Sequence, residues 1–312
     1  MNFKEEILTR LYAGETSGEQ LAAEFGVTRA AVWKCVRQLT KEGFDIIAAT
    51  NRGYRLLPSD VINAPGIARH LRKPWQLEML TETDSTNNVA KARAAAGAAD
   101  LAVIADRQTS GKGRLSRSFF SPGKAGVYLS AVLRPQSLGV ADCGKITAYA
   151  AVATARAVER LSGADVKIKW VNDLWLNGRK ICGILTEGGV GLESGTLDYA
   201  VVGIGVNCRS VKFPDALADV ATNVEDETGV RMDRCELAAE ILNNLARIEQ
   251  EIGSSAFLDE YRSRSCVVGR RITVNGEYEA DAVGIGDDCS LLIRRDGETV
   301  KFFAGEVSVK IK

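Results

Sequence analysis

The sequence has few of the residues that build metal centres and disulfide frameworks. Its 312 residues contain one histidine, His70, and seven cysteines with no CxxC pair. A structural zinc site needs clustered Cys and His ligands, so no metal site made by the protein alone is expected. Reduced thiols in a cytoplasmic protein account for the cysteines most simply.

Long apolar runs and an excess of charge are missing as well. The apolar runs reach only about ten residues, too short to cross a bilayer, and residues 1–10 lack the apolar segment of a signal peptide. No membrane partner is therefore expected. Because 40 Lys and Arg residues balance 40 Asp and Glu residues, a nucleic-acid site must be a local basic patch. The length and the 46% hydrophobic content suggest about two or three domains with real cores.

The first sixty residues are typical of a winged helix-turn-helix. Ser17 and Gln20 form a capping-box pattern, and Thr28 is a candidate cap after a tight turn at Gly26. An Arg52-Gly53 tip separates two short apolar runs, which predicts a hairpin wing. We predict helices over 3–12, 18–25 and 28–42 and wing strands over 45–49 and 54–57.

The third of these helices carries a one-sided basic face. No acid occurs from Arg29 to Lys41. This favours DNA binding over the alternative, a helical hairpin that only docks on the next domain. The candidate DNA contacts are Thr28, Arg29, Ala30, Trp33, Lys34, Arg37 and Arg52.

The rest of the chain predicts two further domains after a linker over 58–65. Strands with few helices between neighbours indicate a mixed sheet backed by helices rather than a Rossmann alternation. From Cys266 onward the runs alternate, with hairpin signals at Asn275-Gly276 and Asp296-Gly297, which predicts a small SH3-like β-barrel. The fold class is therefore multidomain α+β, with domains 1–62, 66–265 and 266–312. Central strands are predicted over 77–83, 101–106, 127–134, 166–170, 181–187 and 197–206, and helices over 88–96, 145–161 and 236–252.

The stretch 106–122 is the most unusual part of the central domain. Its core, Gly111-Lys112-Gly113-Arg114, alternates glycines with cations, and Arg117 follows. Backbone N–H groups of such a loop can form an anion-binding nest, and arginine adds a bidentate fork for phosphate. The loop matches neither the Walker A nor the GxGxxG pattern, and its plain alternative is a solvated basic surface loop.

Four polar clusters of the central domain are candidates for chemistry. Each also has a structural alternative: a helix cap at Ser85, ordinary turns at 172–173 and 177–178, a surface lysine at Lys180, and close strand packing at Gly203 and Gly205. The clusters are Ser85-Thr86-Asn87, Gln108 with the basic loop, 169–173 with 177–180, and 203–207 at the end of an apolar strand.

In this order, the motifs resemble those of the biotin protein ligases. They are STN, QTxGxGRxxR with FxSP, KWxNDLxLxxRKxxGIL, and GxGxN. The resemblance covers essentially all of residues 67–312 and ends with Gly305-Glu306-Val307-Ser308 in the barrel. The N-terminal unit resembles that of the bifunctional subclass, which ligates biotin and represses biotin-synthesis genes.

The resemblance implies formation of biotinyl-5′-AMP from biotin and ATP, then transfer of biotin to one lysine of the biotin carboxyl carrier protein of acetyl-CoA carboxylase. Such a reaction brings a carboxylate onto a phosphorus that carries negative oxygens, so it needs positioned cations. The implied catalytic residues are Lys180, Arg114, Arg117 and Asp173. The implied biotin contacts are Ser85, Thr86, Asn87, Gln108, Lys112, Gly113, Arg114, Lys180, Gly183, Gly203 and Gly205. The implied ATP and adenylate contacts are Gly111, Arg117, Asn172 and Asn207, with Mg²⁺ arriving with ATP near Asp173.

Two departures from the family pattern concern the nucleotide. Lys112 stands where many relatives have Arg, and no Trp follows Trp175, so Phe213-Pro214 is the candidate cover for adenine. Lys112 lacks the guanidinium fork of arginine, which places retention of the adenylate in question. The missing Trp places stacking on the adenine in question.

The bifunctional resemblance also implies regulation. We expect operator DNA of biotin-synthesis genes as a partner and a homodimer promoted by the adenylate, formed through an exposed edge at strand 197–206. The alternatives are a ligase whose N-terminal domain does not regulate transcription, a lipoate-type ligase, and a non-catalytic transcription factor that senses biotin.

Overall fold

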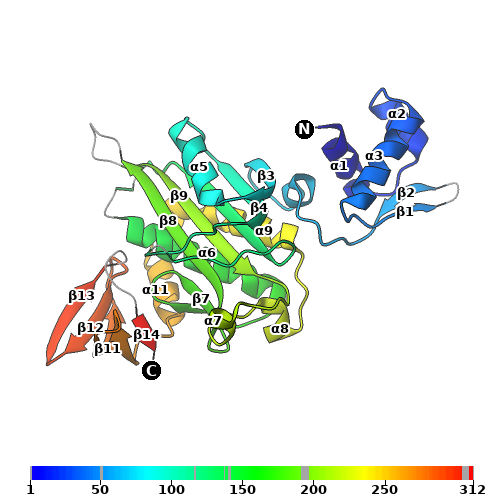
Figure 1. Cartoon of the computed structure of the whole chain (residues 1–312). Coiled ribbons are helices and arrows are strands. Elements are labelled where there is room, and N and C mark those ends of the chain that lie inside the picture. Colours follow the sequence, from blue (N-terminus) through cyan, green and yellow to red (C-terminus); the bar gives the residue numbers. More distant parts are fainter. Residues whose placement is uncertain are drawn as a thin grey trace.

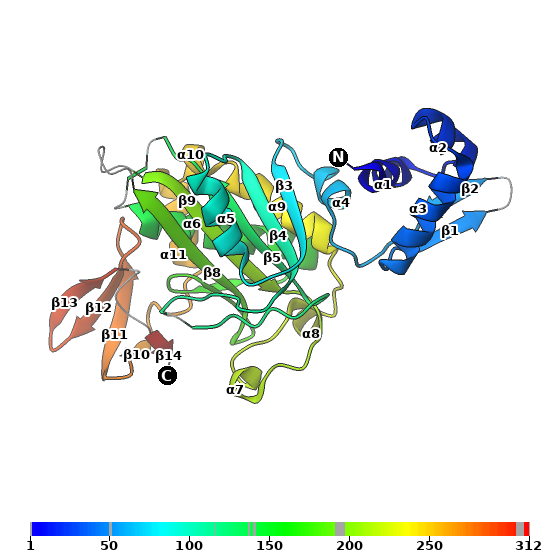
Figure 2. The ribbon, with the colours of Figure 1, turned by 45° about the horizontal axis from the view of Figure 1, so that its top comes forward.

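The computed structural model describes residues 2–49, 52–115, 117–136, 138–139, 142–190, 197–303 and 309–311. The N-terminal unit and the C-terminal sheet lie at opposite ends of a larger central unit (Figures 1 and 2). No helix in these ranges is long and apolar enough to cross a membrane.

The N-terminal unit has the predicted winged helix-turn-helix form. Ser17 accepts a hydrogen bond from the Gln20 amide, so the predicted capping box is present, and Thr28 accepts from the Ala31 amide. The core of this unit includes Ile7, Leu21 and Leu39, all of them buried. Its elements are α1 (Phe3–Ala13), α2 (Gly18–Glu24), α3 (Arg29–Lys41), β1 (Ile46–Ala49) and β2 (Gly53–Leu56).

The segment predicted as a linker is packed against the central unit. Asn63 caps a short helix, α4 (Ala64–Ala68), and donates to the hydroxyl of Tyr12 at 3.0 Å. The guanidinium of Arg69 lies over the ring of Tyr12. Residues 58–65 therefore contribute contacts of their own to both units.

A seven-stranded mixed sheet forms the central unit, as the sequence predicts. Only β3 and β4 are parallel, and every other neighbouring pair is antiparallel. The sheet order is β3 (Gln76–Thr83), β4 (Leu101–Gln108), β5 (Gly126–Leu133), β9 (Leu197–Asn207), β8 (Arg179–Val190), β7 (Asp173–Leu176) and β6 (Lys167–Lys169).

Helices cover both faces of this sheet. On one face α5 (Thr86–Ala95) packs through Ala90 and Ala94 against Val103, Val132 and Val201. The other face meets α6 (Cys143–Ser162), whose buried side is rich in alanine, and α9 (Arg234–Leu245). The remaining helices are α7 (Asp215–Ala218), α8 (Val224–Thr228), α10 (Ile248–Glu251) and α11 (Ser255–Ser263).

The C-terminal unit is a small antiparallel sheet, as predicted for an SH3-like domain. Asn275-Gly276 and Asp296-Gly297 have positive φ at both positions, which the predicted two-residue turns require. The Trp170 indole N–H donates to the Cys289 carbonyl at 2.9 Å and joins this unit to the central one. The sheet order is β13 (Glu298–Phe302), β12 (Leu291–Arg295), β11 (Tyr278–Ile285), β10 (Arg271–Val274) and β14 (Val309–Ile311).

Several expectations about the central unit are wrong. Strand 197–206 is not an edge, because β9 pairs with β5 on one side and β8 on the other. The helix expected over 236–252 is divided into α9 and α10. Strand β7 and helices α7, α8 and α11 were not expected, because each is short or lies among polar residues. The motif Gly305-Glu306-Val307-Ser308 lies outside the described residues.

Candidate functional site

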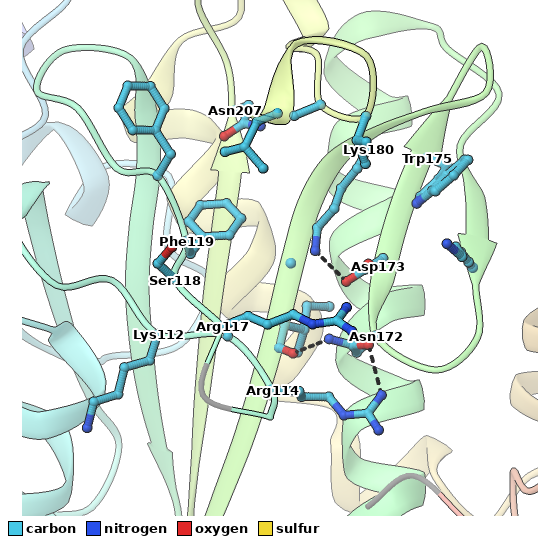
Figure 3. Close-up of a pocket in the computed structure, with 18 of the residues that line it drawn as sticks. Lys112, Arg114, Arg117, Ser118, Phe119, Asn172, Asp173, Trp175, Lys180 and Asn207 are labelled. Carbon is cyan, nitrogen blue, oxygen red and sulfur yellow. Dashed lines mark hydrogen bonds and ion pairs between the residues drawn. The ribbon is translucent and has the colours of Figure 1, made fainter. Parts of the chain in front are cut away.

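A cavity of about 660 Å³ opens between the basic loop and the β7–β8 hairpin (Figure 3). Five basic side chains and one acid, Asp173, line it, so the cavity suits an anionic ligand. The polar and charged lining residues are Lys112, Arg114, Arg117, Ser118, Lys169, Asn172, Asp173, Lys180 and Asn207.

The basic loop folds into a small hairpin at the cavity mouth. The Gly113 amide donates to the Arg117 carbonyl at 2.7 Å, and the Phe119 amide donates to the Gly111 carbonyl at 2.8 Å. The Gly113 amide is therefore occupied in this conformation, and the expected anion-binding nest stays a prediction. The exposed Leu115 forms the tip at positive φ.

Lys180 and Asp173 form an ion pair inside the cavity. The Lys180 ammonium lies 2.7 Å from Asp173 Oδ1, and the two side chains are 26% and 23% exposed. The pairing follows from strand register, since β7 and β8 form a hairpin that brings both residues to one face. The backbone of Lys180 is held separately, by hydrogen bonds to Val220 and Thr222.

Arg114 reaches across the cavity to the motif asparagine. Its Nη1 donates to Asn172 Oδ1 at 3.2 Å, and Asn172 Nδ2 donates to the Ile184 carbonyl at 2.8 Å. Burial lowers the pKa of the Arg114 guanidinium, an effect that the nearby Asp173 charge opposes. An anion bound here would relieve that unfavourable burial.

Lys112 does not join the other cations. Its ammonium donates to Asn88 Oδ1 at 2.6 Å, on α5, and Figure 3 shows the side chain pointing away from Lys180 and Arg114. Lys112 lines both this cavity and a smaller neighbouring pocket.

Aromatic side chains and amides form another part of the cavity wall. Asn207 is buried and donates to the Thr222 carbonyl at 3.0 Å. Phe213 packs on Phe120 with ring centroids 5.9 Å apart, and both rings line the cavity. The candidate cover for adenine, Phe213, is thus on the cavity wall together with Asn207.

A second, smaller pocket adjoins the cavity and shares Lys112, Phe119 and Gly183 with it. Its polar residues are held by one another. The Thr86 amide donates to Gln108 Oε1 at 2.9 Å, and Asn87 Nδ2 donates to Glu187 at 2.8 Å. The pocket is lined by Ser85, Thr86, Asn87, Gln108, Lys112, Phe119, Gly183, Leu185, Gly203, Ile204 and Gly205.

Ser85 is not an ordinary helix cap. It occupies the N-cap position of α5, yet its side chain makes no capping hydrogen bond and is buried at the pocket. The alternative interpretation of Ser85 from sequence is therefore wrong.

The pocket glycines make room for side chains of this chain. A Cβ built on Gly203 would lie 2.0 Å from Asn87 Oδ1, and one on Gly205 would lie 2.4 Å from the ring of Phe119. Gly183 is less crowded, with the Phe119 ring at 3.1 Å and the Lys180 ammonium at 3.2 Å. The expected close approach of these glycines to a ligand stays a prediction.

The candidate DNA contacts lie together on the surface of the N-terminal unit. All seven are exposed, and Trp33 is 52% exposed, which is unusual for so large an apolar side chain. The guanidinium of Arg37 lies 4.7 Å from the Trp33 ring centroid. The cluster has the form of a recognition surface on α3 and the wing.

Three family models match the chain. They are the biotin/lipoate A/B protein ligase family over residues 79–207, an HTH domain over 4–55, and the biotin protein ligase C-terminal domain over 267–310. The bifunctional ligase/repressor BirA of Bacillus spizizenii is 31% identical, over 94% of this chain and 93% of its own. The protein of the same name from Escherichia coli K12 is 30% identical, over 94% and 92%.

The chain belongs to the biotin protein ligase family. The biotin protein ligase of Aquifex aeolicus, solved in complex with biotin and ATP, is similar in structure. Its TM-score is 0.63 at 26% identity, over 76% of this chain and 99% of that one.

Several residues of this biotin protein ligase family site were missed by the sequence analysis. Ser130 is fully buried and hydrogen-bonds both Asn87 Oδ1, at 2.6 Å, and Thr86 Oγ1, at 2.7 Å. Glu187 binds both Asn87 and Lys91. Ser130 lies inside an apolar strand and Glu187 near the end of another, so only three-dimensional contact reveals them.

Lys169 and Trp175 were quoted in the motif but given no role. The Lys169 ammonium lies 4.5 Å from the Trp175 ring centroid, and both residues line the cavity. Burial lowers the pKa of Lys169, although the Asp173 charge opposes this. The Trp175 indole N–H is buried and has no hydrogen-bond partner among the described residues.

Proposed function

We propose that the protein activates biotin with ATP to biotinyl-5′-AMP and transfers the biotin to a lysine of a biotin carboxyl carrier protein. One observation carries the proposal: a polar pocket, whose one charged lining residue is Lys112, adjoins a cationic cavity and shares lining residues with it. Biotin has a neutral ureido head and a carboxylate tail. A ligand with its head in the small pocket would present its carboxylate to the cations of the large one.

We assign the chemistry to the basic side chains of the cavity. Lys180 and Arg114 neutralise the approaching carboxylate and the α-phosphate, and Arg117 faces the leaving pyrophosphate. No covalent enzyme intermediate is needed, since positioning and charge neutralisation supply the rate enhancement. Asn172, Asn207 and Phe213 line the part of the cavity that we assign to adenosine.

The small pocket holds the ureido head through fixed polar groups. Gln108 Nε2 donates to Ser121 and its Oε1 accepts from Thr86, so the orientation of this amide is set before the ligand arrives. The same holds for Asn87, between Ser130 and Glu187. Preorganised donors and acceptors reduce the entropic cost of binding.

Mg²⁺ accompanies ATP in this proposal. Asp173 is the one carboxylate among the lining residues and is already paired with Lys180, and the described residues contain no cluster of three metal ligands. This donor set fits an ion that brings its own phosphate and water ligands, as Mg²⁺ does with nucleotides. Asp173 would supply one oxygen.

The decisive experiment is a ligation assay with biotin, ATP and an apo carrier domain. We expect biotin-dependent pyrophosphate release and a single biotinylated lysine. The same reaction with lipoate in place of biotin tests the lipoate-type alternative, which requires lipoyl transfer. Adenylate binding without any transfer would support the non-catalytic sensor instead.

We propose in addition that the N-terminal unit binds operator DNA of biotin-synthesis genes when the adenylate is bound. The exposed basic face of α3 and the wing supports this. A dimer that places two N-terminal units on one face of the DNA binds more tightly than a single unit does. Binding of the first unit raises the effective concentration of the second at the DNA. A gel shift with upstream DNA, with and without biotin and ATP, tests it; DNA affinity that ignores the ligands would leave a ligase without regulation.

A ligand-promoted dimer needs a free strand edge, and β8 offers one in place of the wrong candidate β9. Its pairing with β7 ends at Gly183, and after Ile184 the described residues pair β8 only with β9. We propose this edge for dimerisation. We also propose that the chain is divided into domains 1–62, 66–265 and 266–312. Sedimentation of the protein alone and with biotin plus ATP would detect the change in mass.

The free cysteines accord with a cytoplasmic location, which we propose for the protein. All seven are unpaired thiols, and burial raises the pKa of Cys182, Cys208 and Cys235. Such thiols are poorly reactive.

A further inference from the structure

One buried guanidinium joins the segment after the DNA-binding unit to the base of the basic loop. Arg234, the first residue of α9, is 2% exposed. Its Nε donates to Asp60 Oδ1 at 2.8 Å, and its Nη1 donates to Asp106 Oδ1 at 3.0 Å. A buried charge is strongly destabilising without its partners, so the contact holds the two carboxylates in place.

The Asp60 end fixes the connecting segment. Arg234 Nη2 donates to the Asp60 backbone carbonyl at 2.8 Å, and the buried Arg209 donates to its carboxylate at 2.7 Å. Burial alone would raise the pKa of Asp60, but the Arg209 hydrogen bond and the Arg234 charge lower it below its ordinary value. The exposed Arg231 adds a third, peripheral pair at 3.1 Å.

The Asp106 end reaches the ligand-binding residues. Asp106 lies in β4 two residues before Gln108, and its carboxylate also accepts from the Lys124 amide at 3.2 Å. Gln108 in turn holds Thr86 and Ser121, and the Ser121 hydroxyl donates to the Phe119 carbonyl. Asp106 therefore lies at the base of the hairpin that carries Arg114.

We infer that Arg234 is a positioning residue that couples the attachment of the DNA-binding unit to the order of the basic loop. Loss of the Asp60 carboxylate leaves the guanidinium with Asp106, the Gly126 carbonyl and the Asp60 backbone carbonyl, and the geometry that ties Asp60 to Asp106 relaxes. By linkage, a ligand that orders the loop must tighten the attachment by the same factor. The ligand end of this inference rests on the proposed function; the contact itself does not.

The test compares Asp60→Asn with Arg231→Ala in the full-length protein. Arg231→Ala is the control, because it also removes an ion pair to the Asp60 carboxylate, but one whose arginine is exposed to solvent. We measure hydrogen exchange of the Gly113 and Phe119 amides against the Ile204 amide in the centre of the sheet, and the dissociation rate of biotinyl-5′-AMP. We expect both loop exchange and dissociation to rise about tenfold in Asp60→Asn, within the usual range of coupling, and neither to change in Arg231→Ala.

Equal exchange in the folded Asp60→Asn variant and wild type overturns the inference. Should that variant not fold, Asp106→Asn tests the reverse direction. It must speed exchange of the Gly66 amide, which donates to Asn63 Oδ1 at 2.8 Å in the connecting segment; an unchanged Gly66 amide refutes the coupling. A wild-type protein that makes no adenylate refutes the proposed function, while the exchange measurements still decide the coupling.

A merely structural ion pair predicts another pattern. If the ion pair were only structural, its loss would raise the hydrogen-exchange rates of the loop amides and of the Ile204 amide by the same factor. It would also leave the KM for biotin unchanged at temperatures where the variant is folded. Coupling predicts a raised KM for biotin with kcat nearly unchanged, because loop order contributes to binding before the chemical step.

Discussion

Replacing Lys180 by alanine separates catalysis from stability, because the two effects differ in size. The ion pair with Asp173 is about one quarter exposed on each side. Pairs near the surface contribute up to about 1 kcal/mol, which in a protein of this size corresponds to a few degrees in Tm. The backbone hydrogen bonds to Val220 and Thr222 do not depend on the side chain. We therefore expect Lys180→Ala to fold.

The effect on adenylate formation is much larger. In the proposed mechanism the transition state develops negative charge beside the Lys180 ammonium, and loss of one preorganised charge of this kind costs about 3–4 kcal/mol, or roughly 10²–10³ in rate. Removal of Lys180 also leaves Asp173 facing the phosphates, which adds repulsion. Both effects slow the first step rather than the transfer.

Single-turnover pyrophosphate release with biotin and ATP measures this step directly. Lys167→Ala is the matched control, since Lys167, the first residue of β6, is 44% exposed and paired with Asp165. We expect the control to react as wild type does. A folded Lys180→Ala variant that releases pyrophosphate within about threefold of wild type, a difference well below that of a lost charge, would remove Lys180 from the mechanism.

Three further predictions follow from the contacts. Arg114→Ala should release biotinyl-5′-AMP, since the loop loses the cation that reaches across the cavity to Asn172; mass spectrometry should then find biotin on lysines of a bystander protein, and selectivity equal to wild type would contradict this. Gly203→Ala should weaken biotin binding at least about tenfold by calorimetry, because its Cβ would lie 2.0 Å from Asn87 Oδ1; Gly253→Ala, with open space around it, is the control. The folded-state pKa of Asp60 is lowered from 3.8, so its contribution to stability is present above about pH 4 and is lost as pH falls through the folded-state pKa. Tm should drop less with acid in Asp60→Asn than in wild type, and identical profiles would count against the ion pair.

Local signals in the sequence were sufficient for most of the elements. The capping residues Ser17 and Thr28 set the starts of α2 and α3 as predicted, since a cap acts within one helical turn. Asn275-Gly276 and Asp296-Gly297 likewise set the turns of the C-terminal sheet. Helix caps and two-residue turns depend on residues that are adjacent in the sequence, so they can be predicted from the sequence alone.

Sheet order and the central contacts of the site could not be predicted in the same way. Strand 197–206 is apolar apart from Asp198 near its start, which is consistent with a buried central strand as well as with an edge. The roles of Gly203 and Gly205 depend on Asn87 and Phe119, which lie about a hundred positions away in the chain. Asp60 falls in a stretch with the composition of a linker, and its three arginine partners follow far downstream. Pairings at such separations leave no periodic signal.

The contacts that hold the cavity cations orient them before an anion binds. Arg114 is oriented by the neutral amide of Asn172, and Lys112 by that of Asn88. An amide oxygen fixes the direction of a cation without cancelling its charge. The Lys180 ammonium is paired with an acid, so binding of a phosphate or carboxylate at Lys180 competes with Asp173. Asp173 thus holds the Lys180 ammonium at the position where we place the reacting carboxylate and α-phosphate, and exchange of Asp173 for these groups is the step by which the site would distinguish its substrate from solvent anions.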